Sequence, residues 1–413
     1  YSSSHFQVTE DIDLGGAENP WTPIGTEENP FKGTLDGDGH TVSGLHINDK
    51  TKDNQGLFGV NGGTIENLTV DGTVTGKDNV GGIAGTNTAD GTIKGCTNNV
   101  NVSGANNVGG IAGKNDGTIT DCTNNGTVTG TGNNVGGITG NNTGTVSGSD
   151  NTGSVSGKDN VGGIAGTNTG TVSGSDNTGS VSGENNVGGI TGNNSGTVSE
   201  SDNGGTVNGT DNVGGITGNN DGNGSVENSK NSGNVTGSGT GAGGIAGNND
   251  GALKNDTNTA PVTGKDDVGG ITGTNGENGT VEGCTNSGNV TGEGTGKPGG
   301  IIGDNQNKNP DAVKDDYYQK TEEINKDLTG IGEGTGSGTD PEGITSGQTP
   351  TNPDRPFNGA GTAEDPYRIG SKEDLEKLRD LVNQGKYSED DHFKLTADIN
   401  LGGSAQDPWK PIG

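Results

Sequence analysis

The sequence predicts an all-β protein folded as a parallel β-helix, a solenoid in which successive coils of the chain stack on one another. Three observations support this prediction: a phrase G-G-I-x-G recurs every 26–30 residues, each period divides into shorter units, and each unit holds one β-branched aliphatic residue. A fixed period of this length is the sequence signature of a solenoid. We expect a right-handed coil with three short strands per ~26 residues, and a left-handed or differently sided solenoid remains the alternative.

The recurring phrase sets the main register of the chain. Leu57 of GLFG leads it, and an isoleucine takes the same place in every later copy. The later copies place Ile83, Ile111, Ile138, Ile164, Ile190, Ile216, Ile245, Ile271 and Ile301. We predict the first eight of these isoleucines as core residues.

Each period contains three copies of a shorter unit, N-x-G-x-(V/I)-x-G. The asparagines of one such period are Asn168, Asn177, Asn186 and Asn194. The aliphatic residues four positions later are Val172, Val181, Ile190 and Val198. Asparagine and glycine favour turns, and β-branched residues favour half-buried strands, so each unit is predicted to be a strand and a turn.

Stacking explains how a chain with few apolar residues builds a core. Equivalent side chains of neighbouring coils lie about one strand spacing apart, roughly 4.8 Å, and therefore form continuous columns. Beside the isoleucines, the predicted core includes Val146, Val155, Val172 and Val181.

Two slots of the repeat hold asparagine in nearly every coil. The first slot holds Asn87, Asn115, Asn142, Asn168, Asn194, Asn220, Asn249, Asn275 and Asn305. The second slot holds Asn98, Asn124, Asn151, Asn177, Asn203, Asn231, Asn258 and Asn286. We expect each set to form a ladder of stacked amides that satisfies polar groups at the corners of the coils.

Composition alone predicts disorder. The 413 residues are 22% hydrophobic, include 88 glycines and carry a formal net charge of -31. Such chains usually bury too little apolar surface to offset the loss of chain entropy. A disordered tract has no reason to keep a fixed period, so the repeat decides in favour of a folded solenoid.

The charge balance also limits the partners of the protein. Only three arginines occur, Arg355, Arg368 and Arg379, all near the C-terminus. Without a basic surface the chain is not expected to bind nucleic acid or an anionic membrane. No apolar run approaches the ~20 residues that cross a bilayer, so no membrane insertion is expected.

Five segments differ in composition and period. Residues 1–50 are predicted to form wider lead-in coils, 51–305 the regular solenoid, and 306–332 a closing turn that covers the last coil. Residues 333–356 are rich in Gly, Thr, Pro and Ser and are predicted to be a linker. Residues 357–413 contain a helix and the start of a second module.

The second module is visible as a repeat of the first. HFKLTADINLGG at 392–403 repeats HFQVTEDIDLGG at 5–16, and PWKPIG at 408–413 repeats PWTPIG at 20–25. Before the second copy stands PYRIGSKEDLEKLRDLVNQG, which predicts a short capping helix with Ser371 as N-cap and Gly385 as stop. We expect tandem modules, and one hypothesis is that 357–413 covers the first coil of another copy to give head-to-tail fibres.

Three cysteines share one slot of the repeat. Cys96 and Cys122 fall in adjacent coils, where their Cα atoms should lie about 5 Å apart, within disulfide range. Other coils place serine in this slot. A Cys96–Cys122 disulfide and two thiols that merely fill a serine position are therefore both open, with Cys284 unpaired.

No catalytic or metal-binding pattern stands out. His5 and His392 are equivalent positions of the two modules, which favours a structural role for both. Asp36 and Asp38 in LDGDGH are predicted to form a turn, because the further oxygen ligands of a calcium loop are missing. We expect no cofactor, and the acidity leaves weak, diffuse Ca²⁺ binding open.

The solenoid phrase and its lead-in resemble the GLUG-repeat family of bacterial surface proteins. The resemblance rests on GLFG at 56–59, the GGIAG and GGITG phrases, and DIDL at 11–14, W-x-P-I-G at 21–25 and F-x-G-x-x-D-G-x-G-H at 31–40. It implies a secreted or wall-attached bacterial protein of the adhesin, filamentous-haemagglutinin-like type with a β-helical stalk.

Three classes of function are compatible with these observations. The first is a non-enzymatic structural module of a cell-surface fibre or adhesin, which self-associates or occurs in tandem and contacts host or matrix glycans or proteins. The second is a polysaccharide-cleaving enzyme, which would need carboxylates with Arg or Lys partners, and the solenoid has no arginine. The third is polysaccharide or ice binding through outward ranks such as Thr118/Thr120, Thr145/Ser147 and Thr171/Ser173, which Lys94, Glu227, Lys254 and Glu282 interrupt.

Overall fold

The computed structural model describes residues 4–320, 325, 327–333, 341–344, 367–369, 372–383 and 392–395. The chain divides into two compact units, residues 1–343 and 344–413. The boundary falls inside the predicted linker 333–356, most of which lies outside the described residues, as do Ser371, Gly385 and the PWKPIG segment.

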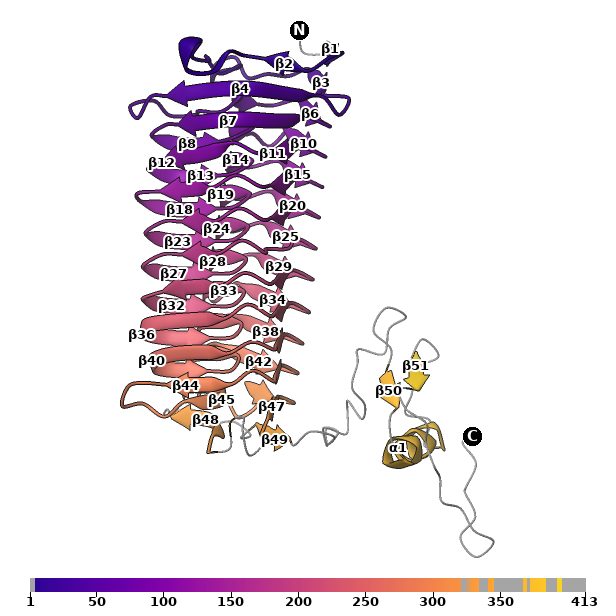
Figure 1. The fold of residues 1–413 in the computed structure, drawn as a ribbon. Coiled ribbons are helices and arrows are strands. Elements are labelled where there is room, and N and C mark those ends of the chain that lie inside the picture. The colour runs from indigo at the N-terminus through magenta and orange to yellow at the C-terminus, as the bar shows by residue number, and fades with distance from the viewer. Residues whose placement is uncertain are drawn as a thin grey trace, which may run out of the picture. The chain divides into compact units, whose positions relative to one another are not determined.

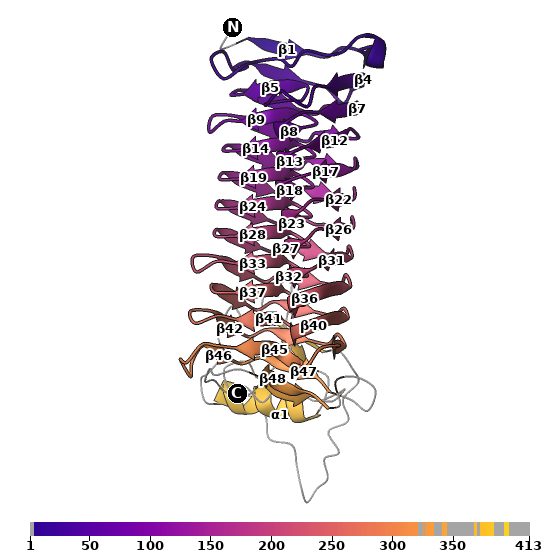
Figure 2. The ribbon, with the colours of Figure 1, turned by 90° about the vertical axis from the view of Figure 1, so that its left-hand side faces the viewer.

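The first unit is a parallel β-solenoid, which confirms the predicted fold class (Figures 1 and 2). One face is a sheet of 12 strands in chain order, paired in parallel. Its strands are β1 (His5–Gln7), β3 (Thr34–Asp36), β6 (Thr64–Glu66), β10 (Thr92–Lys94), β15 (Thr118–Thr120), β20 (Thr145–Ser147), β25 (Thr171–Ser173), β29 (Thr197–Ser199), β34 (Ser225–Glu227), β38 (Ala252–Lys254), β42 (Thr280–Glu282) and β46 (Val313–Lys314).

The rest of each coil belongs to a second, 31-stranded sheet and to a six-stranded sheet. The 31 strands are β2 (Ile12–Asp13), β4 (Thr41–Asn48), β5 (Phe58–Asn61), β7 (Thr69–Thr75), β8 (Asp78–Gly81), β9 (Ala84–Asn87), β11 (Thr97–Asn98), β12 (Asn101–Gly104), β13 (Asn106–Gly109), β14 (Ala112–Asn115), β16 (Thr123–Asn124), β17 (Val128–Gly130), β18 (Asn133–Gly136), β19 (Thr139–Asn142), β21 (Asp150–Asn151), β22 (Val155–Ser156), β23 (Asp159–Gly162), β24 (Ala165–Asn168), β26 (Val181–Ser182), β27 (Asn185–Gly188), β28 (Thr191–Asn194), β31 (Val207–Gly209), β32 (Asp211–Gly214), β33 (Thr217–Asn220), β36 (Val235–Gly243), β37 (Ala246–Asn249), β40 (Val262–Gly269), β41 (Thr272–Asn275), β44 (Val290–Gly292), β45 (Gly299–Asn305) and β48 (Thr329–Glu333). The six strands are β30 (Asp202–Asn203), β35 (Lys230–Asn231), β39 (Thr257–Asn258), β43 (Thr285–Asn286), β47 (Tyr317–Gln319) and β49 (Glu342–Ile344). The lead-in also contains a 3-10 turn, η1 (Gly16–Glu18).

One regular coil shows how the sequence units map onto the strands. Between residues 185 and 209 the chain runs through β27, β28, β29, β30 and β31, and each segment pairs with the equivalent segment of the next coil. The three units of the sequence thus appear as five short segments, because glycines and asparagines bend the chain between them. Handedness stays a prediction.

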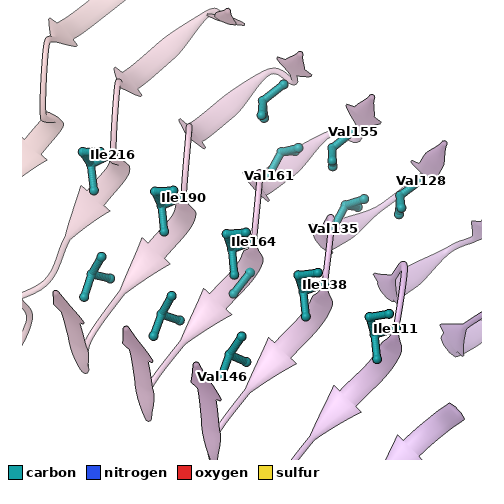
Figure 3. Close-up of a cluster of buried hydrophobic side chains, with 14 of the residues drawn as sticks. Ile111, Val128, Val135, Ile138, Val146, Val155, Val161, Ile164, Ile190 and Ile216 are labelled. Atoms are coloured by element: carbon teal, nitrogen blue, oxygen red, sulfur yellow. The ribbon is translucent and has the colours of Figure 1, made fainter. Parts of the chain in front are cut away.

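The core consists of four apolar columns (Figure 3). In the coil of β27 the four inward aliphatic residues are Val187, Ile190, Val198 and Val207, and each is 0% exposed. The predicted core residues are all buried, none more than 1% exposed. The column of Val187 was not predicted, although the valine of N-V-G-G-I marks it in the sequence. That column contains Val80, Val108, Val135, Val161, Val187, Val213, Ala242 and Val268.

The second glycine of the G-G-I phrase is required by close packing between coils. A Cβ built on Gly189 would lie 2.1 Å from the carbonyl oxygen of Gly215 and 2.3 Å from Cγ of Asn203. Only a hydrogen atom fits there, since real Cβ atoms do not approach other heavy atoms this closely. The glycine therefore lets the amide of the second asparagine slot lie flat against the backbone.

Larger side chains replace the asparagines at both ends of the stack. Phe31 is the parallel bridge partner of Asn61 in the lead-in. In the closing turn Tyr318 takes the register position after Asn286, and its ring packs against Gly300. The hydroxyl group of Tyr318 donates to the carbonyl oxygen of Leu328 at 3.0 Å. Tyr317 and Tyr318, from which the closing turn was predicted, are both buried: Tyr317 is 7% exposed and Tyr318 is 3% exposed.

The second unit contains the helix expected near the C-terminus. Strand β50 (Tyr367–Ile369) pairs in parallel with β51 (Phe393–Leu395), and α1 (Lys372–Asn383) lies between them in sequence. Leu375, Leu378 and Val382 of α1 are half-buried.

We predict that Gly189→Ala lowers the free energy of unfolding by about 1–3 kcal/mol, because the added methyl group overpacks the contact with the next coil. Gly204→Ala in the same coil is the matched control, since its nearest heavy atom to a new Cβ is 3.8 Å away. Chemical denaturation followed by circular dichroism measures both. Equal losses of stability in the two variants would contradict this packing argument.

Candidate functional site

The first asparagine slot forms a continuous buried ladder. It begins one coil earlier than predicted, at Asn61, which also stands in an N-x-G-x-I unit. Each Nδ2 donates to the Oδ1 atom of the asparagine in the next coil at 2.8–3.0 Å, from Asn61 to Asn305. All predicted members are at most 1% exposed.

The second slot forms a parallel ladder from Asn98 to Asn286 with spacings of 2.7–2.9 Å. Asn203 shows why a buried amide is tolerated there. Its Nδ2 donates to Gly205 O and to Asn231 Oδ1, and its Oδ1 accepts from the Gly205 amide and from Asn177 Nδ2. Both donor hydrogens and both lone pairs are used, so the cost of burying the amide is offset.

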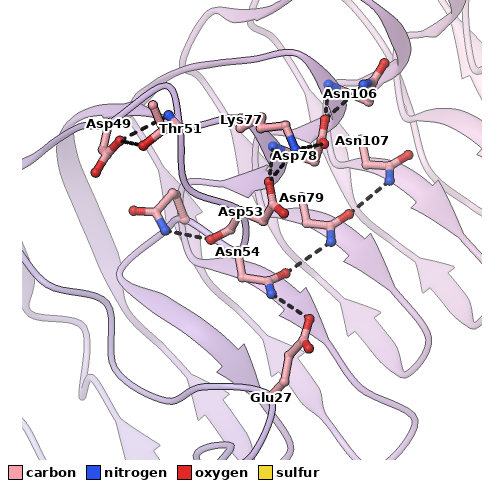
Figure 4. Close-up of polar contacts among 11 residues, drawn as sticks. Glu27, Asp49, Thr51, Asp53, Asn54, Lys77, Asp78, Asn79, Asn106 and Asn107 are labelled. Atoms are coloured by element: carbon pink, nitrogen blue, oxygen red, sulfur yellow. Dashed lines mark hydrogen bonds and ion pairs between the residues drawn. The ribbon is translucent and has the colours of Figure 1, made fainter.

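A third ladder runs along the outside of one corner and was not predicted (Figure 4). Its asparagines lie in the left-handed region, with φ near +50° to +60°. Each Nδ2 donates to the preceding coil, the reverse of the buried ladders. The members are Asn54, Asn79, Asn107, Asn134, Asn160, Asn186 and Asn212.

This outer ladder corrects the assignment of Asn186 to the same unit as Asn168 and Asn177. Asn186 is half-buried with φ +52°, whereas the other two are fully buried. The valine that follows it points into the core, so the side chain before it must point outward. At its first coil the ladder ends on a carboxylate, because Asn54 Nδ2 donates to Glu27 Oε1 at 3.0 Å.

Of the two alternatives open for Cys96 and Cys122, a disulfide and a pair of thiols, the structure has free, buried thiols. Each Sγ contacts a carbonyl oxygen of its own strand, Lys94 O at 3.4 Å and Thr120 O at 3.3 Å. The two side chains therefore point the same way in parallel, whereas a disulfide needs a dihedral angle near ±90°. The hydrogen bond that the Cys122 thiol donates to Cys96, together with burial, raises the pKa of Cys122 well above its usual value.

The cysteine slot is one buried column that also holds serines and two aspartates. From Cys122 to Ser201, each backbone N–H donates to the Oγ atom in the next coil at 3.1–3.3 Å. Asp256 and Asp316 continue this role, accepting from the amides of Ser229 and Cys284 at 2.9 and 2.7 Å. A residue in this slot thus needs a side-chain atom that accepts from the backbone amide of the preceding coil, and a carboxylate serves as well as a hydroxyl group.

The two aspartates are the most strongly perturbed carboxyl groups of the described chain. Burial raises the pKa of Asp256 and of Asp316 well above the usual range, more than their backbone hydrogen bonds lower it. Oδ2 of Asp256 accepts from the Lys254 amide at 3.1 Å. Oδ2 of Asp316 is buried without a hydrogen-bond partner among the described residues. In both carboxyl groups, burial thus disfavours the charged form more than the hydrogen bonds favour it.

The histidines and the Asp-Gly-Asp-Gly segment have structural partners. His40 Nδ1 lies 3.2 Å from Asp11 Oδ1, and His46 Nδ1 lies 3.0 Å from Thr73 Oγ1. Residues 36–40 form a turn in which the Asp38 amide donates to Asp36 Oδ1 at 2.9 Å. Within the described ranges, no group of three His, Cys, Asp or Glu residues is arranged to hold a metal ion.

Two grooves lie in the first coils of the solenoid. One groove of about 770 Å³ is lined by the loop of Trp21 and Glu27 and by Asp49, Lys52 and Asp53. Lys77 links Asp53 to Asp78 at 3.5 and 3.2 Å along the same corner (Figure 4). Trp21 Nε1 donates to Leu57 O at 3.0 Å, which fixes the indole against the coil.

A second groove, of about 700 Å³, lies beside β1 and is mainly apolar. The rings of Phe6, Phe31 and Phe58 follow one another into it, with centroids 6.3 and 5.1 Å apart. Phe6 is 46% exposed and Ile24 is 39% exposed, in contrast to the buried columns behind them.

Comparison with known families identifies the repeat unit. Residues 104–129 match the family model described as the GLUG motif. They form one coil from β13 to β17, and the same order of segments recurs in register along the solenoid. The chain carries GLUG repeats. The resemblance predicted from GLFG and GGIAG is thereby confirmed.

Two curated relatives share part of this sequence. Halomucin of Haloquadratum walsbyi is 33% identical over 141 residues, which is 31% of this chain and 1% of halomucin. A candidate Gly-rich membrane protein of Evansella cellulosilytica is 40% identical over 93 residues, which is 20% of this chain and 11% of that protein. The GLUG-repeat chain thus spans only a small part of either relative.

One solved structure, a candidate immunoglobulin A1 protease from Bacteroides ovatus, is 17% identical to the chain. The match covers 83% of this chain and 78% of that one, with a TM-score of 0.33, which is too low to support an argument. No helix in the described part of the GLUG-repeat chain has the length and hydropathy that a membrane crossing requires.

We predict that Asn124→Ala destabilises the protein by about 1–3 kcal/mol or more, because it removes the hydrogen bonds that Asn124 makes with Asn98 Nδ2 and with Asn151 Oδ1 inside the core. The adjacent Asn125→Ala is the matched control. Its exposed side chain bonds to Asn99 and Thr152 on the outside, where water replaces the lost bonds. Urea unfolding should separate the two variants, and equal stabilities would refute a structural role for the buried ladder.

We predict that Asp256→Ser increases stability at pH 7 and has less effect at pH 4. A carboxyl group whose pKa is raised by folding contributes stability below its unfolded pKa, and that contribution is lost as the pH rises through the folded pKa. Serine fills this slot in the coils before Asp256, and it keeps an acceptor for the Ser229 amide. Thermal unfolding at both pH values measures the effect, with exposed Asp311→Ser as the control. A variant no more stable than the wild type at pH 7 would contradict the argument.

Proposed function

We propose that the chain is a structural module of a secreted or cell-surface bacterial protein, a rigid rod within a fibre or adhesin. The observation that carries the proposal is the continuous 12-stranded parallel sheet from β1 to β46, in which each strand pairs with the equivalent strand of the next coil. Twelve stacked strands at about 4.8 Å give a rod roughly 50 Å long whose length depends only on the number of coils. The names of the relatives, halomucin and a membrane protein, support a location at the cell surface.

The proposed role is mechanical and adhesive, not catalytic. A continuous ladder of hydrogen bonds along the axis resists bending, because every coil is held to both neighbours at each corner. The net charge of -31 keeps such rods apart and soluble and makes nucleic acid an unsuitable partner. The proposed partners are further modules of the same protein, joined head to tail, and glycans or proteins of a host or matrix.

A second candidate function is polysaccharide binding by the 12-stranded face. The outward residues Thr145 and Ser147 lie in register with Thr171 and Ser173, which in turn meet the equivalent pair of β29. The residues of the first two pairs are half-buried, Thr197 of β29 is exposed, and the three pairs follow one another in register. The rank is short, because Lys94 and Glu227 interrupt it on either side.

The location test uses antibodies raised against the full chain. We expect them to label intact cells of the producing organism, while antibodies against a cytosolic protein label only lysed cells. Labelling restricted to lysed cells would overturn the proposed surface role. A glycan and matrix-protein array tests the second candidate. Binding of the wild-type chain to a polysaccharide, together with loss of that binding in Thr171→Lys, would favour polysaccharide binding.

A further inference from the structure

One face of the solenoid carries no charge along eight successive coils. Its strands are β12, β17, β22, β26, β31, β36, β40 and β44, which pair in parallel and follow one another down the stack (Figures 1 and 2). Each strand contains a buried valine equivalent to Val181 of β26. The residues three before, one before and one after this valine point outward, and we call these positions of the eight coils the neutral face.

The coil of β26 shows the composition of the neutral face. Thr178, Ser180 and Ser182 are exposed around the buried Val181. Only Asn, Ser and Thr fill the equivalent positions of the other seven coils, apart from one glycine and one proline. No residue of the neutral face is charged, although the protein carries a net charge of -31. The acidic side chains of these coils therefore lie on other faces.

Several polar groups of the neutral face are available to a ligand. Ser182, Asn208 and Thr236 lie in register in successive coils, and all three are exposed. Among the described residues, their side chains have no hydrogen-bond partner. Each of these groups both donates and accepts hydrogen bonds, and such short side chains lose little conformational entropy when a ligand orders them.

A row of carboxylates borders the neutral face along one edge. Asp150, Asp176 and Asp202 take the next outward position in successive coils, and Lys230 follows them. Each Oδ1 atom accepts from the backbone amide at this position in the next coil, at 3.0–3.2 Å. The row repels a polyanion, whereas the hydroxyl groups of a neutral polymer can donate to it. The charges around the face therefore favour a neutral partner.

The size and composition of the neutral face distinguish a glycan from a protein partner. Eight coils and three outward columns cover about 800 Å², near the area that each partner contributes to a standard protein interface. The centre of such an interface is rich in Tyr, Trp, Met and Arg, and the neutral face contains none of them. Hydroxyl and amide groups instead match a partner that is itself covered with hydroxyl groups.

We propose that the neutral face binds a neutral linear polysaccharide that lies along the stack of coils. The inference rests on the proposed adhesive function of the rod, and it names the surface and the charge class of the glycan. This face is distinct from the 12-stranded one. A polymer that contacts several coils gains affinity from many weak contacts, because each further contact is made within the same complex.

The test is affinity electrophoresis of the full-length chain in gels that contain β-glucan, arabinoxylan or galactomannan, with alginate as the polyanion. We expect at least one neutral polymer to retard the chain and alginate to have no effect. The double variant Ser182→Lys and Asn208→Lys should bind about tenfold more weakly, because two long side chains then lie across the face. Both positions are exposed, and circular dichroism checks that the variant is folded.

The matched control is the double variant Thr171→Lys and Thr197→Lys, which alters two in-register positions of the 12-stranded face. It should bind as the wild type does. Absence of retardation by every neutral polymer, retardation by alginate, or loss of binding in the control variant alone overturns the proposal. So does a wild-type dimer in sedimentation velocity that the Ser182→Lys and Asn208→Lys variant lacks, since a second copy would then occupy the face. Surface labelling of cells is independent of these results, so failure of the neutral face and failure of the rod function are distinguishable.

Discussion

The hydrogen bond between side-chain amides of neighbouring coils is the interaction on which this solenoid depends. Each coil has only four apolar columns, mostly valine and isoleucine, and two of its corners are filled by asparagine. A buried amide is costly unless all of its hydrogen bonds are made. In this fold they are made only when the coils stack in one register, since each amide bonds its own turn and both neighbouring amides. Register and burial are therefore fixed together.

This constraint explains the rest of the sequence. Glycines such as Gly189 stand where the amide column touches the backbone and leaves no room for a Cβ. The column of cysteine, serine and aspartate supplies one acceptor per coil to the preceding backbone amide. At the ends of the stack, where no further asparagine follows, Phe31 and Tyr318 take the same positions with larger, less polar side chains. A rod built this way has little need for the usual share of hydrophobic residues.

Much of the fold was predictable because the repeat brings each kind of residue to the same place in every coil. The period gave the solenoid, the isoleucine column and the two buried ladders, which need no knowledge of distant contacts. The unit N-x-G-x-(V/I) does not show which asparagines face outward, because Asn186 and Asn177 share it. The signal lies in the next residue, since the buried Val187 follows Asn186 whereas Thr178 follows Asn177. The free thiols of Cys96 and Cys122 likewise depend on side-chain direction, which spacing alone does not give. The grooves of the lead-in arise from non-repeating loops, for which one copy offers no pattern to compare.

The most direct test of the stacking account compares two deletion variants, one that lacks a whole coil and one that lacks half a coil. Removing residues 160–185 joins Asp159 to Asn186 and leaves every ladder and column in register, so the account predicts a cooperatively folded protein whose rod is shorter by about 4.8 Å in small-angle scattering. Removing residues 160–172 alone places asparagines against valines, and the account predicts loss of cooperative unfolding. Equal stability of the two deletions, or unfolding of the 26-residue deletion, would contradict it.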